Sequence, residues 1–239
     1  MYGHYGYYGY YIDPTYILVL IGAVICMIAS ANVKSTYNKY ARYRSGSGMT
    51  GAQAAERLLW ASGIRDVKVG HVSGNLTDHY NPAKKVLNLS DSVYNSTSVA
   101  AIGVAAHECG HAIQHARGYA PLNIRTAIVP VANIGSTLAW PVILIGLLIN
   151  SQSSQMIINI GIIMFSFAVV FQLVTLPVEF NASQRALALL EQQGILGQEE
   201  LTHTKKVLGA AALTYVASAA TAILQLLRLI ILFGGKRRD

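Results

Sequence analysis

Long stretches without a charged side chain dominate the pattern of polar and apolar positions along this chain. No Asp, Glu, Lys or Arg occurs in residues 14–33, 126–178 or 207–227. A helix needs about 20 consecutive apolar residues to cross a bilayer. The polar stretch 150–155 divides the longest gap into two such segments. The pattern therefore predicts four membrane-spanning helices, over residues 16–33, 126–149, 156–178 and 207–227, the last of them continuing to residue 233.

Two of these segments have a second interpretation. The last is either a span or a helix that lies in the interface or lines a groove, because it carries five polar side chains. They are Thr214, Ser218, Thr221, Gln225 and Arg228. The first segment resembles a signal peptide, but residues 1–15 lack the basic start of one, so we expect a retained anchor. The six tyrosines of residues 2–11 fit an aromatic belt or an unstructured tail.

Basic residues next to the first span indicate its orientation. Lys34, Lys39, Arg42 and Arg44 follow it, and no Lys or Arg precedes it. The positive-inside rule then places the N-terminus outside and the site-bearing insert in the cytoplasm. The basic tail 236–238 falls outside on a four-span count, a conflict that disappears if the last helix is interfacial. The parts are an anchor (1–33), a cytoplasmic insert (34–125), a transmembrane hairpin (126–178), a cytoplasmic segment (179–206) and a C-terminal transmembrane or interfacial helix with its tail (207–239).

Composition narrows the class of protein further. Hydrophobic residues make up 53% of the 239 residues and charged residues 12%, which argues against a disordered chain and against a freely soluble globular protein. The net charge is +7; we assign the basic excess to the membrane flanks and expect no nucleic-acid partner. The two cysteines, Cys26 and Cys109, provide no disulfide framework.

The insert is predicted to combine helices with a small antiparallel sheet. Thr50 is placed to cap a helix that runs to about Ser62. Three strand-like pieces follow, over residues 67–72, 76–80 and 86–89. Residues 86–90 are either an edge strand that pairs with a peptide or a purely structural strand. A long helix over 99–117 is then expected to begin after Ser98 and to end at Gly118.

That helix carries the sequence His107-Glu108-Cys109-Gly110-His111, an H-E-x-x-H motif. Histidines four residues apart lie on one face of a helix, so both imidazoles can bind one metal ion. Glu108 is then placed to act as the general base. Imidazole and carboxylate ligands suit zinc, and a catalytic zinc ion keeps one of its four positions for water. The alternative is an ordinary surface helix, but small and apolar neighbours would bury its histidines without partners.

A third protein ligand must come from elsewhere in the chain. His115 lies too far along the same helix, about 12 Å from His107 at 1.5 Å per residue, and is expected to support the site or face the substrate. Glu179 is the favoured ligand, because a carboxylate at the end of an uncharged span is costly unless it is used. The alternative is an acid near a helix N-terminus after Pro177.

Four stretches of the chain resemble one protein family. They are residues 76–82 (LTDHYNP), 86–94 (VLNLSDSVY), 107–115 (HECGHAIQH) and 176–183 (LPVEFNAS). Together they are similar to the YugP-type membrane zinc metallopeptidases (neutral zinc metallopeptidases), and more distantly to the HtpX and prenyl-protein proteases. The resemblance covers residues 46–230. It implies one zinc ion held by His107, His111 and Glu179, with Glu108 as the base, in a bacterial plasma membrane.

Other polar residues are candidates for supporting roles. Related enzymes often carry an acid shortly after the third ligand; here Asn181 and Ser183 lie nearby, and Asn181 is the candidate partner of a histidine. Arg185 either stabilises an oxyanion, pairs with Glu179, or is an ordinary surface arginine. His79, like Tyr80, is either an oxyanion donor or a solvated strand residue.

The sequence thus predicts a mainly α membrane protein with about four transmembrane helices and a zincin-like α+β insert. The expected function is a zinc endopeptidase that cleaves polypeptides, above all membrane proteins, at the cytoplasmic membrane face. A non-catalytic membrane scaffold with a structural metal is the alternative, and a fourth protein ligand would favour it. A metal transporter or sensor would need ionisable residues within the spans, which apart from Arg228 are almost absent.

Overall fold

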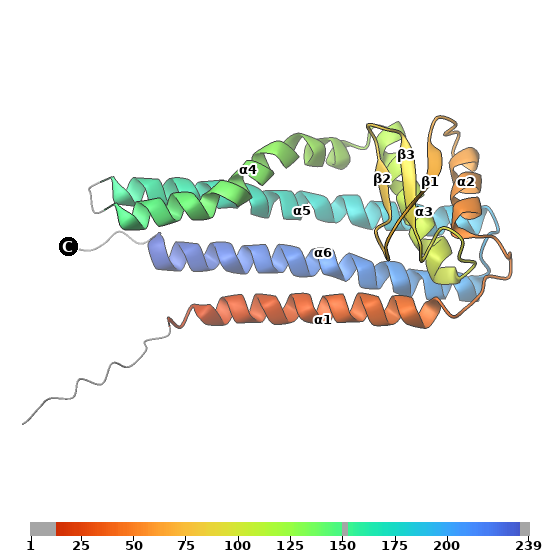
Figure 1. Ribbon diagram of the computed structural model, residues 1–239, viewed down its shortest axis with the longest axis horizontal. Helices are drawn as coiled ribbons and strands as arrows, with labels where there is room; N and C mark the ends of the chain where they lie inside the picture. Colours follow the sequence, from red (N-terminus) through yellow and green to blue (C-terminus); the bar gives the residue numbers. More distant parts are fainter. Residues whose placement is uncertain (1–12, 150–152, 235–239) are drawn as a thin grey trace, which may run out of the picture.

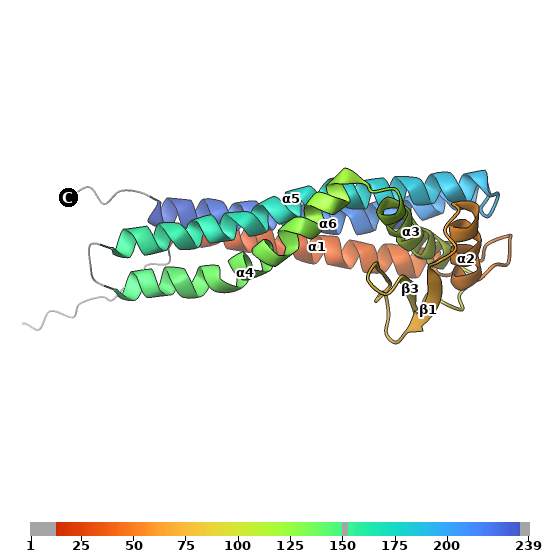
Figure 2. The same ribbon diagram turned by 90° about the horizontal axis from the view of Figure 1, so that it is seen from above.

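A computed structural model describes residues 13–149 and 153–234 of the chain. It is an elongated bundle of four long helices with a small α+β unit at one end (Figures 1 and 2). The long helices are α1 (Tyr16–Tyr40), α4 (Ala120–Leu148), α5 (Ser154–Gln192) and α6 (Gln198–Phe233). The tyrosine-rich start, residues 150–152 and the basic tail lie outside the described residues, so what the sequence predicts for them stays a prediction.

All four long helices are long and apolar enough to cross a membrane. Their number agrees with the charge pattern, and α6 is one continuous helix that packs against α1 and α5. Large apolar side chains such as Met27 and Leu148 remain 62% and 75% exposed, as expected for helices that lipid surrounds. All four helices extend beyond the charge gaps.

Helix α5 corrects one part of the sequence interpretation. The sequence offered a helix start after Pro177, with Glu179 near its N-terminus. Instead α5 continues through Pro177 for 39 residues, and Glu179 lies more than six turns from its beginning. The macrodipole explanation for this acid is therefore wrong, because the dipole effect is confined to the first and last turns of a helix.

The end unit contains α2 (Gly51–Ala61), α3 (Val99–Ala116) and three strands. Thr50 caps α2 in a capping box with Gln53, and the Ser98 hydroxyl caps α3, as the sequence predicts. Helix α3 packs between α2 on one side and α5 and α6 on the other. Its small residues, such as Ala105 and Ala106, are fully buried, so the motif helix forms the centre of this unit.

The sheet is mixed, and not antiparallel as expected. Its strands are β1 (Lys68–Val72), β2 (His79–Asn81) and β3 (Val86–Ser90), in the order β1-β3-β2. β2 and β3 form an antiparallel hairpin, whereas β1 lies on the far side of β3 and runs parallel to it. The expected second strand over 76–80 begins only at His79, because Leu76 has a positive φ of 55°. β3 is therefore central, and its predicted role as an edge strand is wrong.

Candidate metal centre

Helix α3 reaches its neighbours through small residues, and one of them lies inside the motif itself. A Cβ atom added to Gly110 would lie 2.5 Å from the Ala182 carbonyl oxygen on α5, closer than real atoms approach. On the same helix, a Cβ atom at Gly103 would lie 2.6 Å from Thr204 of α6. These glycines let the backbones of α3 and α5, and of α3 and α6, approach closely. The close approach of α3 and α5 brings Glu179 beside the two histidines.

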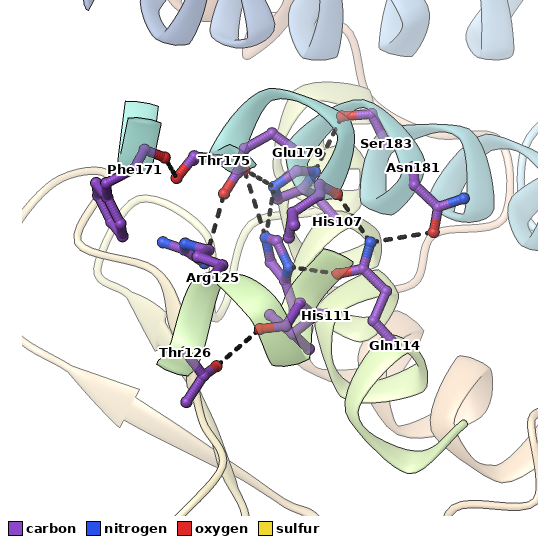
Figure 3. Close-up of polar contacts among 12 residues, drawn as sticks. His107, His111, Gln114, Arg125, Thr126, Phe171, Thr175, Glu179, Asn181 and Ser183 are labelled. Atoms are coloured by element: carbon purple, nitrogen blue, oxygen red, sulfur yellow. Dashed lines mark hydrogen bonds and ion pairs between the residues drawn. The ribbon is translucent and has the colours of Figure 1, made fainter. Parts of the chain in front are cut away.

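Three side chains converge where α3 meets α5 (Figure 3). The Nε2 atoms of His107 and His111 are 3.1 Å apart, and Glu179 Oε2 lies 3.3 Å and 3.5 Å from them. Tetrahedral zinc with ligands at 2.0–2.2 Å requires separations of about 3.3–3.6 Å between ligand atoms. The two distances to Glu179 fall in this range and the distance between the imidazoles is slightly shorter, so the group has close to the spacing that one zinc ion needs, as the motif and the charge gap together predict.

The hydrogen bonds behind the ligands leave their lone pairs facing one another. His111 Nδ1 lies 3.1 Å from Gln114 Oε1, which can only accept, so this nitrogen donates and Nε2 keeps its lone pair. His107 Nδ1 lies 3.1 Å from the Ser183 hydroxyl. Glu179 Oε2 is buried and has no hydrogen-bond partner among the described residues. A metal ion between these three atoms would be bound by all of them.

The electrostatics of the group also favour a cation. Burial by itself would lower the pKa of His111, but the carboxylates of Glu179 and Glu108 outweigh it, and the pKa lies above its ordinary value. Cys109, on the other face of α3, is fully buried, and burial together with the Glu108 charge raises the pKa of its thiol. Cys109 therefore contributes to packing. On the other face of α3, the negative charges of Glu108 and Glu179 act on His111.

A cavity of about 600 Å³ opens beside the ligands. Glu108, only 8% exposed, lines it together with His111 and Glu179. No hydrogen bond or ion pair joins the Glu108 carboxylate to another described residue, so it is free to act on a molecule in the cavity. The remaining wall comes from strand β2 and from three helices: it includes His79, Tyr80, His115, Arg125 and Tyr215.

Comparisons with known proteins agree with this centre. The model of the family described as "Putative neutral zinc metallopeptidase" matches residues 15–234. The chain belongs to this family. It is also 47% identical over 205 residues, 86% of this chain and 90% of the relative, to the "Putative membrane protease YugP" of Bacillus subtilis (strain 168). No solved structure matches the chain significantly. Zinc is thus the ion expected of this metallopeptidase family at His107, His111 and Glu179.

Asn181 and Arg185 take other positions than the sequence suggested. Asn181 does not contact a histidine: its Oδ1 accepts hydrogen bonds from Gln114 Nε2 at 3.1 Å and from Arg185 Nε at 2.7 Å. Asn181 thus orients Gln114, which in turn orients His111. Arg185 has no contact with Glu179 among the described residues, so it holds Asn181 in place.

His79 and His115 both line the cavity, and each has hydrogen-bond partners on its ring. His115 Nδ1 pairs with the Tyr80 hydroxyl at 3.0 Å, which joins α3 to β2. In His79, Nδ1 donates to the Thr77 carbonyl oxygen at 2.9 Å, and Nε2 lies 3.1 Å from the Asn88 amide nitrogen. Both ring nitrogens of His79 are therefore engaged, which removes the observation that would support it as an oxyanion donor.

Several residues around the candidate metal centre were not found from the sequence. Gln114 lies three residues after His111, and Ser183 four after Glu179, so helical spacing alone would have suggested both. Ser183 was noticed only as a neighbour of Glu179 and not as the partner of His107. Arg125 and Tyr215 come from α4 and α6, and no spacing rule connects them to the motif. Their places depend on how the long helices pack.

Proposed function

We propose that this chain is a membrane-embedded zinc endopeptidase that cleaves polypeptides at the cytoplasmic membrane surface. The observation that carries the proposal is the position of Glu108. Its carboxylate lines the same cavity as a three-ligand centre, and three ligands leave the fourth tetrahedral position of zinc open to that cavity. Among the described residues no further His, Cys, Asp or Glu joins the group, which speaks against a purely structural metal.

The chemistry of hydrolysis divides between the ion and the chain. Bound zinc would polarise the scissile carbonyl and lower the pKa of water. Glu108 accepts a proton from the water as its oxygen bonds to the carbonyl carbon, and delivers a proton to the amide nitrogen as the carbon–nitrogen bond breaks. Ser183 and Gln114 hold the two imidazoles so that Nε2 of each faces the ion.

Strand β2 supports a polypeptide as the substrate. It forms an edge of the described sheet and contributes His79 and Tyr80 to the cavity wall. An extended peptide can pair with the main chain of an edge strand whatever its side chains are. We therefore assign the pairing with a peptide, which the sequence suggested for β3, to β2. Leu122 and Thr126 of α4 also line the cavity, which favours segments close to the bilayer, in membrane proteins above all.

The cytoplasmic orientation rests on charge. Four basic residues, Lys34, Lys39, Arg42 and Arg44, lie at or just after the end of α1 that is next to the α+β unit. The positive-inside rule favours this end, and with it the metal centre, on the cytoplasmic side of the membrane. The membrane that we propose is a bacterial plasma membrane. The B. subtilis relative is named as a membrane protease, which supports the membrane but does not bear on the side.

The test compares Glu108→Gln with His107→Ala in the full-length protein, purified in detergent. We expect Glu108→Gln to retain one zinc ion by metal analysis and to lose cleavage of labelled casein by at least about 10²-fold. His107→Ala should lose both zinc and cleavage. Glu56→Gln, on the exposed face of α2, is the matched control and should behave as wild type. Undiminished cleavage by Glu108→Gln would contradict the mechanism.

A further inference from the structure

Arg125, near the start of α4, brings a guanidinium group into the cavity beside the metal ligands (Figure 3). Its Nη1 lies 3.9 Å from Glu179 Oε1, and the group lies 5.9 Å from the Phe171 ring. The Nε atom is buried and has no acceptor. None of the five N–H groups of Arg125 makes a hydrogen bond to another described residue.

Neutralising Glu179 does not account for this geometry. An arginine that pairs with a carboxylate usually forms two parallel hydrogen bonds of about 2.7–2.9 Å. Here the nearest approach is an ångström longer. Unpaired donors inside a protein cost free energy unless a ligand supplies the acceptor. The Arg125 side chain is 31% exposed, and the space that it adjoins is the cavity, so a molecule bound there can supply the acceptor.

We propose that Arg125 donates hydrogen bonds to the oxygen of the scissile carbonyl as that oxygen becomes negative. The inference rests on the proposed peptidase function. Glu179 lies between the metal-binding histidines and Arg125: its Oε2 atom faces the imidazoles, and its Oε1 atom faces the guanidinium. A carbonyl oxygen at the open side of the metal centre therefore lies within reach of the guanidinium. Fixed cationic donors aimed at developing charge lower the barrier more than they strengthen substrate binding.

The residue's surroundings support a fixed donor. Arg125 is one residue before the uncharged stretch of α4, where a cation is costly and is therefore a candidate functional group. Helix α4 packs closely on α5 through Gly135, which faces the Met164 carbonyl, and Gly146, where an added Cβ atom would lie 2.7 Å from Ile158. Arg125 is carried by α4 and Glu179 by α5, so the packing of these two helices brings the guanidinium and the carboxylate to the same cavity.

The experiment measures Arg125→Gln and Arg125→Lys in the full-length protein, with Arg117→Gln as the control. Arg117 is an exposed arginine at the end of α3 and is not part of the cavity lining. The substrate is an internally quenched peptide, prepared with a free and with an amidated C-terminus. Zinc content, melting temperature, kcat, KM and the Kd of a phosphinic peptide of the same sequence are measured for each variant.

We expect Arg125→Gln to keep its zinc and to lose about 10²–10³-fold in kcat, with KM changed by less than about threefold. The Kd of the phosphinic peptide should rise with the fall in kcat/KM, because its tetrahedral oxyanion resembles the transition state. Arg125→Lys keeps the charge but loses the fork of donors, so it should recover only part of the rate. Both peptide forms should be affected equally.

Four outcomes would overturn the proposal. Loss of zinc in Arg125→Gln, with full activity in Arg125→Lys, would show that the arginine only balances the charge of Glu179. An effect confined to KM of the free-C-terminal peptide would show that it binds a substrate carboxylate. An active wild type with unaffected Arg125 variants would remove this inference alone, whereas an inactive wild type, equal to Glu108→Gln, would remove the peptidase function as well.

Discussion

An arginine lies near a carboxylate at two widely separated points of the bundle, and the two pairs behave differently. Beside the α+β unit, Arg125 Nη1 lies 3.9 Å from Glu179. At the opposite end of the bundle, where α1 begins and α6 ends (Figure 1), Arg228 Nη2 lies 3.7 Å from Asp13 Oδ2. In both arginines the buried Nε atom has no acceptor among the described residues. Distance and unpaired donors alone therefore do not identify a functional site.

The surroundings of the carboxylates make the difference. Asp13 is 30% exposed, and its oxygens accept hydrogen bonds from the Thr15 amide and hydroxyl at 2.9 Å and 2.7 Å. Arg228 lies over the Tyr16 ring at 4.4 Å, and its side chain is 10% exposed. Glu179 is only 4% exposed, and its Oε2 lies beside the Nε2 atoms of two histidines. Asp13 thus has hydrogen-bond partners next to it in the chain, whereas Glu179 belongs to a group of three side chains that could hold a metal ion.

The strongest contrast between the two ends comes from removing each carboxylate. We expect Glu179→Ala to lose nearly all bound zinc and all hydrolysis, because two histidines alone cannot complete the centre. Asp13→Asn should keep both, and should change the free energy of unfolding by only about 1 kcal/mol, because Asp13 is partly exposed and lies 3.7 Å from Arg228. Metal analysis and thermal unfolding measure the two effects. Equal zinc content in wild type and Glu179→Ala would contradict the assignment of the third ligand.

A second substitution tests whether helix packing assembles the metal end. Gly110→Ala adds a methyl group against the Ala182 carbonyl oxygen at 2.5 Å, so α3 and α5 must separate. We expect a loss of about 1–3 kcal/mol in stability together with weaker zinc binding. Gly209→Ala is the control, because a Cβ atom there meets nothing within 4 Å, and it should be neutral or stabilising by up to about 1 kcal/mol. Normal zinc affinity in Gly110→Ala would mean that the helix approach tolerates change.

The smallest expected effect concerns the partner of one histidine. Ser183→Ala removes the hydroxyl 3.1 Å from His107 Nδ1, and loss of such a partner typically weakens metal binding about 10–100-fold. Competition with a zinc chelator measures this change. Ser166→Ala, on the same helix, removes a hydroxyl bonded to the Ile162 carbonyl and should leave the affinity unchanged. Equal affinities of the two variants would show that Ser183 does not orient the ligand.

Local patterns predicted the elements of the site well. The H-E-x-x-H spacing identified α3, and the Thr50 and Ser98 caps placed the starts of α2 and α3 correctly. The uncharged stretches identified four long apolar helices. Glu179 was found because a carboxylate in such a place is costly unless used. All of these signals depend on neighbours within one or two helical turns or on a single long hydrophobic run.

Features that depend on distant segments were missed or wrong. The parallel pairing of β1 with β3 was not foreseen, because residue alternation does not reveal which strand lies next to which. Pro177 indicated a helix break, but α5 continues through it. Arg125 and Tyr215 reach the cavity from helices whose contacts no local pattern specifies.

The amino-acid sequence by itself determined the chemistry of this protein: two imidazoles on one helical face, an adjacent acid and a carboxylate at the edge of an apolar run. Only the tertiary structure decided that these groups meet, with ligand atoms 3.1–3.5 Å apart, and which arginine stands beside them. The physical reason is that helical periodicity acts over a few residues, whereas the approach of α3 to α5 depends on two backbones that come into contact where Gly110 has no side chain.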